Sequence, residues 1–205
     1  MNTKFLQFGL VCFGLLPALL SHSGPRVIQD IYPGTVPEGS GPREFARLND
    51  RVLFSALLEG SIGRELWITD GTESGTKLVR DLRIGSSWGA PEGIIELNGV
   101  ALFAGDDGIH GNELWITDGT PGGTRMLKDL DPIDGDPEFL VRYKDRIFFS
   151  AENEPNGQEV FVSDGTEEGT LVFVDLVPGP DDSDPEQLAV AADLLFFVAD
   201  LPDTG

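Results

Sequence analysis

One octapeptide recurs along this chain and constrains its fold more than any other feature. Residues 65–72 read Glu-Leu-Trp-Ile-Thr-Asp-Gly-Thr, residues 113–120 repeat it, and residues 159–166 carry the weaker copy Glu-Val-Phe-Val-Ser-Asp-Gly-Thr. The copies start 48 and 46 residues apart, a period typical of repeat architectures rather than of a single-core domain. The motif positions are Glu65, Leu66, Trp67, Asp70, Gly71, Thr72, Glu113, Leu114, Trp115, Asp118, Gly119, Thr120, Glu159, Val160, Phe161, Asp164, Gly165 and Thr166.

Each motif belongs to a longer unit. A segment ending in Asp-Leu follows it at 77–82, 125–130 and 171–176, and two apolar runs joined by a tight polar turn precede it. Asn98-Gly99 is the clearest of these turns, because both residue types tolerate positive φ. Four short β-branched or aromatic runs per unit predict a four-stranded antiparallel meander.

The runs are apolar on both faces, as in Arg-Ile-Phe-Phe-Ser-Ala at 146–151. A strand with one buried face alternates between apolar and polar residues, so these strands are expected to be covered on both sides. Small sheets packed face to face around an axis form a β-propeller. The sequence therefore predicts an all-β, propeller-like fold built from units of about 46–48 residues. A parallel β-solenoid and a stacked β-sandwich are the alternatives.

The repeat divides the chain into about three full blades and two partial ones. The predicted segments are a signal peptide at 1–23 and a repeat domain at 24–205, with an orphan strand at 27–31, units at about 42–84, 91–132 and 137–178, and a partial unit at 185–205. One interpretation is the front end of a longer repeat protein or a truncated reading frame. In another, strand 27–31 closes a three-stranded blade with residues 185–199.

Residues 1–23 have the features of an export signal. Lys4 supplies a positive n-region, residues 5–20 are predominantly apolar, and small residues precede Gly24. A membrane anchor is the alternative, but the run is short for a bilayer span and contains Pro17. We therefore expect a secreted or cell-surface protein with no transmembrane anchor after cleavage. Cleavage would remove Cys12, the only cysteine, so no disulfide is expected.

The residue types within the motif indicate a structural role. An aspartate can accept hydrogen bonds from backbone N–H groups two residues on, and a glycine supplies positive φ in a bulged turn. We predict that the glycine at the far side of each loop also has a positive φ. Trp67 and Trp115 are expected to fill space between neighbouring sheets, with carbohydrate stacking as the functional alternative. The far glycines are Gly75, Gly123 and Gly169.

On these residues the chain resembles the ELWxxDGT repeat family, tandem units of exported bacterial proteins with largely undefined roles. The resemblance covers roughly residues 26–205. The first two copies match every fixed position, and the third departs at Val160 and Phe161. It implies a propeller-like scaffold and supplies no catalytic residue.

The sequence offers little for catalysis or cofactor binding. After signal cleavage His110 is the single histidine, which excludes a Cys/His zinc site, and no nucleophile elbow accompanies it. We predict no catalytic and no cofactor-binding residue, and read His110 as an exposed turn residue. Calcium is the one metal that the acidic loops leave possible, with solvated acidic loops as the alternative. The candidate ligands are Asp134, Asp136, Asp181, Asp182 and Asp184.

The charge balance narrows the choice of partners. The chain has 35 acidic and 14 basic residues and a net charge of −21, which excludes nucleic acids and anionic membranes as primary partners. We expect an exported scaffold for binding or adhesion to an extracellular protein or carbohydrate. The alternatives are a fragment of a polysaccharide-acting hydrolase or lyase, which would need paired carboxylates, and a structural module of a larger surface protein.

Overall fold

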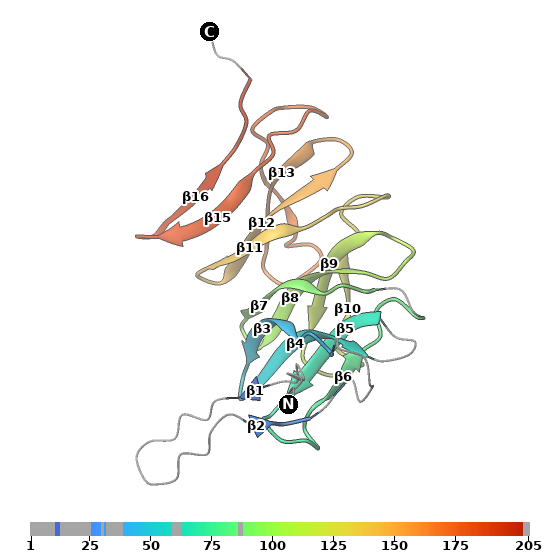
Figure 1. Cartoon of the computed structure of the whole chain (residues 1–205). Helices are drawn as coiled ribbons and strands as arrows, with labels where there is room; N and C mark the ends of the chain where they lie inside the picture. The colour runs from blue at the N-terminus through green and yellow to red at the C-terminus, as the bar shows by residue number, and fades with distance from the viewer. Residues whose placement is uncertain are drawn as a thin grey trace, which may run out of the picture.

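The computed structural model describes residues 11–12, 26–29, 31, 39–58, 63–85 and 88–202. This part of the chain consists of strands, turns and loops and contains no helix (Figure 1). None of its segments therefore provides a helix that is long and apolar enough to cross a membrane. The predicted all-β class is confirmed.

Three four-stranded antiparallel sheets and a two-stranded partial sheet follow one another, each with its strands in chain order. The first sheet contains β3 (Arg43–Leu48), β4 (Arg51–Leu58), β5 (Gly63–Thr69) and β6 (Lys77–Arg80). The second contains β7 (Glu92–Leu97), β8 (Val100–Asp106), β9 (Asn112–Thr117) and β10 (Arg125–Lys128). The third contains β11 (Glu138–Tyr143), β12 (Arg146–Asn153), β13 (Gly157–Ser163) and β14 (Leu171–Val174). The partial sheet contains β15 (Glu186–Ala191) and β16 (Leu194–Val198). The predicted four-stranded meander is confirmed.

Tight turns join the first and second strands of every sheet. Asn98 and Gly99 have φ values of 52° and 91°, as a two-residue hairpin turn requires. Each first strand also contains a bulge, where its register against the second strand shifts. A bulge bends and twists the strand, here close to the point where the chain enters each sheet. The bulged positions with positive φ are Glu44, Gly93, Phe139 and Gln187.

Successive sheets pack face to face, which explains why the strands are apolar on both faces. Phe103 and Trp115 of the second sheet share a buried cluster with Leu53 of the first. Equivalent apolar clusters fill the spaces between the second and third sheets and between the third and partial sheets. An inner strand is thus covered on both sides and cannot show the alternation of a half-buried strand.

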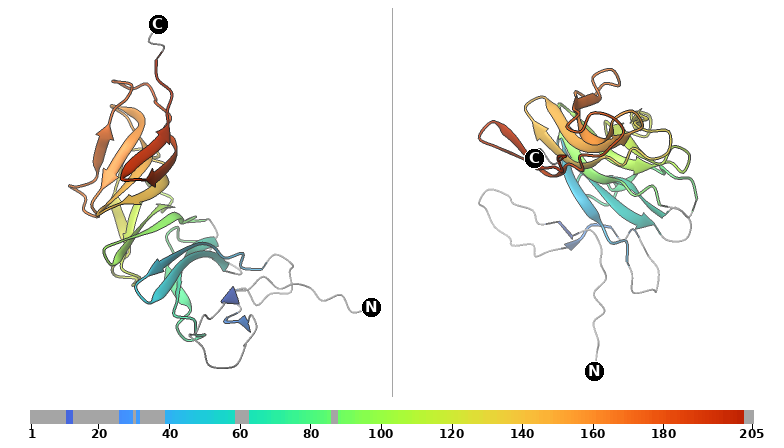
Figure 2. Two further views of the ribbon diagram at one scale, coloured as in Figure 1. Left: turned by 90° about the vertical axis from the view of Figure 1, so that its left-hand side faces the viewer. Right: turned by 90° about the horizontal axis from the view of Figure 1, so that it is seen from above.

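The sheets are arranged like blades. The main strand-to-strand contacts between neighbouring sheets are made by the first strands, β3 with β7, β7 with β11, and β11 with β15. The sheets follow one another along a curved stack from the N-terminal to the C-terminal region (Figure 2). This propeller-like arrangement brings equivalent loops of successive units to the same end of the stack.

The segment before the first sheet differs from the expectation. The strand predicted over 27–31 is confined to β2 (Arg26–Val27), which pairs with β1 (Val11–Cys12). Ile28 and Ile31 are buried against the first sheet, whereas β15 and β16 pack on the third. The described part of 27–31 therefore shares no sheet with 185–199. The predicted signal peptide, apart from β1, lies outside the described residues.

Candidate functional site

The loops gather at two opposite ends of the strands. The DGT end carries the turns between first and second strands and the loops between third and fourth strands, at 70–76, 118–124 and 164–170. The crossover end carries the loops between second and third strands and the connections from one sheet to the next, at 81–91, 129–137 and 175–185. Backbone hydrogen bonds such as Asp106 N to Gly89 O (2.9 Å) hold the loops of the crossover end together.

The repeated Asp-Gly-Thr residues form hydrogen bonds within their own loop. Asp70 Oδ1 accepts the backbone N–H (2.9 Å) and the hydroxyl (2.7 Å) of Thr72. Thr72 Oγ1 accepts the N–H of Gly75 at 3.0 Å, and the hydroxyls of Thr69 and Thr76 pair at 2.7 Å. The other two DGT loops repeat these bonds. The hydrogen bonds from Thr72 lower the pKa of Asp70, because they favour the ionised form.

The two glycines of each DGT loop serve different purposes. The first has the predicted positive φ, at Gly71, Gly119 and Gly165. The same prediction for the second is wrong at Gly75, Gly123 and Gly169, which do not have a left-handed backbone. A Cβ at Gly123 would lie 2.1 Å from Asp118 Oδ1. The second position therefore requires glycine because the aspartate carboxylate lies against the backbone.

The motif aromatics are packing residues. Trp115 is 3% exposed, lies between the first and second sheets, and donates its Nε1–H to Gly105 O at 2.9 Å. Trp67 is 5% exposed and packs against Ile28 and Ile31. Phe161 lies in the cluster shared by the second and third sheets. None of these rings offers an open face for stacking on a sugar.

The motif glutamate has a role that the sequence reasoning missed. The side chain of Glu65 is fully buried and accepts the backbone N–H groups of Leu82 (2.7 Å) and Gly89 (2.9 Å), which belong to the connection to the second sheet. Glu113 accepts the N–H groups of Leu130 (2.7 Å) and Gly135 (2.9 Å) in the next connection. Each buried glutamate thereby holds the crossover between its own sheet and the following one.

Glu159 repeats this arrangement with one change. It accepts the N–H of Leu176 at 3.0 Å and the hydroxyl of Ser183 at 2.6 Å. In all three units the first acceptor bond reaches 17 residues along the chain, to the leucine of Asp-Leu. That constant spacing is the sequence signal that could have indicated the pairing. Burial raises the pKa of Glu65 and Glu113 to about 7.

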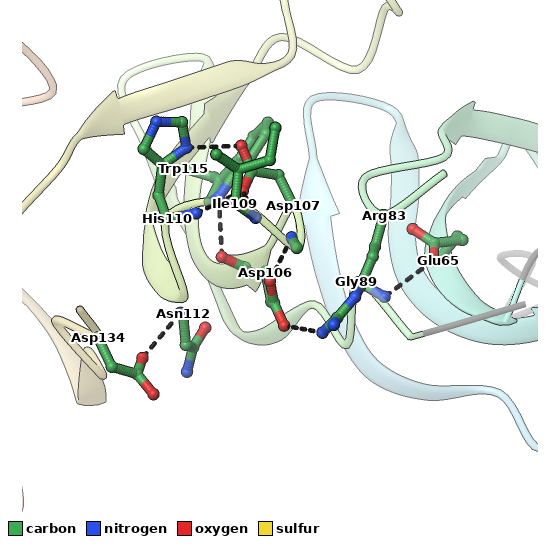
Figure 3. A network of polar contacts seen from close by, with 12 residues as sticks. Glu65, Arg83, Gly89, Asp106, Asp107, Ile109, His110, Asn112, Trp115 and Asp134 are labelled. Atoms are coloured by element: carbon green, nitrogen blue, oxygen red, sulfur yellow. Dashed lines mark hydrogen bonds and ion pairs between the residues drawn. The ribbon is translucent and has the colours of Figure 1, made fainter. Parts of the chain in front are cut away.

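The loop between β8 and β9 carries the single histidine of the described chain. His110 Nδ1 lies 2.8 Å from Asp107 Oδ2, and Asp107 Oδ1 accepts the backbone N–H of Ile109 (2.8 Å) and of His110 (3.0 Å) (Figure 3). The hydrogen bond with Asp107 raises the pKa of His110. Within the described residues the imidazole hydrogen-bonds to a carboxylate and to no hydroxyl, so a Ser-His-Asp triad is not assembled around it.

Polar contacts connect this loop to both neighbouring connections. Arg83, from the preceding connection, forms an ion pair with Asp106. On the other side, Asn112 donates its backbone N–H to Asp134 at 2.7 Å (Figure 3). Its side-chain amide donates to Asp136 at 2.8 Å. The loop is thus held in place between two crossovers.

The calcium candidates do not form a common cluster in the described structure. Asp134 and Asp136 hydrogen-bond to Asn112, and Asp182 accepts the backbone N–H of Gln158 at 2.9 Å. Among the described residues, no group of three or more His, Cys, Asp or Glu side chains could hold a metal ion. Calcium binding by these loops, with Asp181 and Asp184, stays a sequence-based prediction.

A cavity at the crossover end brings several carboxylates together. It has a volume of about 210 Å³ and is lined by residues of the first, second and third sheets, among them Glu44, Glu92, Asp136 and Glu138. Burial raises the pKa of Glu138, and the charges of Asp136, Glu186 and Glu92 raise it further. Glu92, Glu138 and Glu186 are the first residues of the first strands of their sheets. In the first sheet this position holds a basic residue, Arg43, which forms an ion pair with Glu92 at 2.8 Å.

Comparisons with known proteins identify no family for this chain. A scan against protein-family models and a search of curated proteins found no match to the chain. Membership of the ELWxxDGT repeat family therefore stays an expectation from the motif residues.

Proposed function

We propose that this protein is an exported scaffold that binds an extracellular ligand through the loops of its crossover end. The observation that carries the proposal is the unequal use of the two ends. The DGT loops repeat the same internal hydrogen bonds three times. The crossover loops differ between units and expose charged and apolar side chains. Binding proteins commonly place variable loops on a rigid frame in this way.

The differences between equivalent loops are chemical. In the second sheet the loop after the second strand carries the Asp107–His110 pair and Ile109, which is 81% exposed. In the third sheet the equivalent loop carries Glu154 and Asn156, whose side-chain amide donates to Asp175 at 3.0 Å. A ligand that spans two units would meet a different surface at each.

The charge of the crossover end favours a ligand with cationic groups. Its carboxylates outnumber its basic side chains, so the field attracts positive charge and speeds encounter with a basic partner. Export is supported by the signal-like residues 1–23. The carboxylates of this end that bear on the argument are Glu92, Asp106, Asp134, Asp136, Glu138, Glu152, Asp182, Asp184 and Glu186, against Arg43, Arg64 and Arg83.

The proposal is tested by removing the same number of negative charges from each end in turn. The crossover variant carries Glu138→Gln, Glu152→Gln and Glu186→Gln, and the matched control carries Glu73→Gln, Glu167→Gln and Glu168→Gln in the DGT loops. Both sets remove three negative charges. Binding to immobilised oligolysine, a cationic chitosan oligosaccharide and a neutral glucan is measured at low and moderate salt. The crossover variant should bind a cationic probe about tenfold more weakly than the control. Equal losses of probe binding in both variants would contradict binding at the crossover end in particular. If the chain bound none of the probes, a purely structural role in a larger protein would be favoured.

A second candidate function is hydrolysis or lysis of a polysaccharide. It is favoured by one observation, the carboxylate-lined cavity in which the pKa of Glu138 is raised, because glycoside hydrolases use one protonated and one ionised carboxyl group. The test is release of reducing or unsaturated ends from a panel of polysaccharides by the intact chain and by Glu138→Gln. Activity that the substitution abolishes would replace the scaffold proposal.

A further inference from the structure

We propose that the carboxylate-lined cavity of about 210 Å³ at the crossover end binds a guanidinium group, carried by an arginine side chain of an extracellular peptide or protein. This assignment, which rests on the proposed function, gives a cationic ligand of that end both a position and a chemical group. The chain itself holds a guanidinium in the equivalent space one unit earlier.

In the first sheet that space contains the side chain of Arg64, the residue immediately before the motif glutamate. Arg64 is 6% exposed, and its Nη1 donates to Gly41 O at 2.9 Å and to Ser55 Oγ at 3.2 Å. Ser55 lies opposite Arg43 of the first strand, and Arg43 forms the ion pair with Glu92 of the second sheet. The first sheet therefore supplies its own buried guanidinium at the corner where it meets the second sheet.

The second sheet has smaller residues at the equivalent positions. Asn112 takes the position of Arg64, immediately before the motif glutamate. Ala104 takes the position of Ser55, opposite the leucine of the motif. Both Asn112 and Ala104 line the cavity. The cavity thus lies where the first sheet places its guanidinium, because the second sheet has neither the long basic side chain nor the hydroxyl that accepts from it.

The charges around the cavity favour a cation. The described residues that line it include four carboxylates and no basic side chain. The carboxylates are Glu44, Glu92, Asp136 and Glu138. The first three already have partners within the chain, which are the backbone N–H of Gly93, the guanidinium of Arg43 and the side-chain amide of Asn112 in that order. Within the described residues the carboxylate of Glu138 has no hydrogen bond or ion pair, so it is the group that an incoming cation would neutralise.

The lining also favours a guanidinium over an ammonium group. Phe139 lines the cavity and is 39% exposed, so its ring is accessible to a ligand. A guanidinium is planar, stacks on aromatic rings, is more weakly hydrated than an ammonium and can donate to two carboxylate oxygens at once. An arginine side chain is therefore expected to bind more tightly than a lysine side chain.

The probe is an end-blocked peptide, Gly-Gly-Arg-Gly-Gly, compared with peptides that carry lysine or citrulline in place of the arginine. Citrulline has nearly the same shape as arginine but no charge. Each peptide is titrated into the isotopically labelled intact chain at low salt, and binding is followed by NMR from the amide signals of Gly93 and Phe139, two residues of the lining.

The decisive variant is Asn112→Arg, which gives the second sheet the same basic side chain as the first. Gln158→Arg is the matched control, because Gln158 holds the equivalent position in the third sheet and does not line the cavity. Glu138→Gln is a second variant that removes the carboxylate with little change of size, and it keeps the test open if Asn112→Arg does not fold.

The arginine peptide should bind the native chain and Gln158→Arg with equal affinity and shift both amide signals. It should bind Asn112→Arg and Glu138→Gln about tenfold more weakly, and the lysine and citrulline peptides should bind the native chain more weakly still. Absence of binding to the native chain, or equal binding of the arginine and citrulline peptides, would overturn the assignment. If the triple crossover variant lost oligolysine binding while Asn112→Arg and Glu138→Gln bound the arginine peptide like the native chain, the proposed function would stand and this cavity would be rejected as its site.

Discussion

The two ends of the strands use carboxylates in opposite ways. At the DGT end, Asp118 is exposed, and hydrogen bonds from the side chain and backbone of Thr120 lower its pKa. At the crossover end, Glu113 is fully buried and burial raises its pKa to about 7. Both groups accept two main hydrogen bonds from the chain, yet one is solvated and the other is not.

The difference lies in how far the hydrogen bonds reach. Those of Asp118 go to Thr120, two residues away, so a single unit can form its DGT loop. Those of Glu113 reach 17 and 22 residues along the chain, to Leu130 and Gly135, and hold the connection to the next sheet. The DGT end therefore shapes one sheet, whereas the crossover end couples two.

The largest expected effect is from Glu113→Ala. The substitution leaves the buried N–H groups of Leu130 and Gly135 without their acceptor, and each such group costs about 1–3 kcal/mol. The free energy of unfolding should fall by about 4 kcal/mol, measured by urea unfolding at pH 7. Glu113→Gln, which keeps one acceptor oxygen, should lose about half as much.

Asp118→Ala is the control for this prediction. Its partners are exposed and can bond to water, so it should lower stability by no more than about 1 kcal/mol. A cost as large as that of Glu113→Ala would break the distinction between the two ends.

A second prediction separates the neighbouring glycines of one DGT loop. Gly123→Ala places a methyl group in the position of the Asp118 carboxylate and should cost about 2 kcal/mol. A Cβ at Gly122 would meet no atom within 4 Å, and this residue lacks a left-handed backbone, so Gly122→Ala should be neutral or slightly stabilising. Thermal unfolding of the two variants gives the comparison.

The double variant Gly123→Ala/Asp118→Ala sharpens this result. Removing the carboxylate removes the clash, so the double variant should cost less than the sum of the single ones. Strict additivity would mean that the glycine is required for some other reason.

The carboxylates at the two ends should affect the pH dependence of stability in different pH ranges. For Glu65 and Glu113 the folded pKa lies near 7, above the ordinary 4.5. The folded chain therefore holds more protons than the unfolded chain between these values, and stability falls as pH rises through this window. For Asp70, Asp118 and Asp164 the pKa is lowered, so their stabilisation is present above the unfolded pKa of 3.8 and is lost as pH falls through the folded pKa.

Urea unfolding midpoints measured from acid to neutral pH test both parts of this profile, the loss of stability at acid pH (the acid limb) and the decline towards neutral pH. Glu113→Gln should flatten the decline towards neutral pH and leave the acid limb unchanged. Asp118→Asn should flatten the acid limb alone. An unchanged profile in Glu113→Gln would show that this carboxyl does not titrate between the two pKa values.

The smallest effect is expected from Arg83→Ala. The ion pair of Arg83 with Asp106 joins a loop to a crossover, but both side chains are partly exposed. Its loss should change stability by less than about 0.5 kcal/mol, and added salt should reduce the difference further. If Arg83→Ala lowered stability more than Asp118→Ala does, surface ion pairs would have to be counted among the main interactions that hold the crossover end together.

The fold could be predicted because its signals are local. Asn98-Gly99 marks a hairpin from two residues, and the apolar runs on either side mark the paired strands. The DGT loop is predictable for the same reason, since Asp70 and Thr72 bond within one turn. The prediction for Gly75 is wrong because a sequence does not distinguish a glycine needed for positive φ from one needed for close approach.

The buried glutamates could not be placed from the sequence because their partners are main-chain N–H groups, which no residue type marks. Glu65 reaches Leu82 and Gly89 only after the crossover has folded over the sheet. The prediction of a full strand over 27–31 is wrong for a related reason. Its side chains, Ile28 and Ile31, match the apolar pattern of a strand, but their burial comes from packing on the first sheet and not from pairing.

The position of each glutamate also has a consequence for how such a chain can change in length. One of its hydrogen bonds reaches a leucine 17 residues along the chain in every unit, and another reaches the connection to the next unit, 22 or 24 residues along. Insertion or deletion of one whole period, begun at any point, would leave every remaining glutamate with its donors. A change of half a period would remove either the carboxylate or the N–H groups. The repeat therefore has no privileged starting residue, and duplication of complete periods is the change in length that this architecture accepts at least cost.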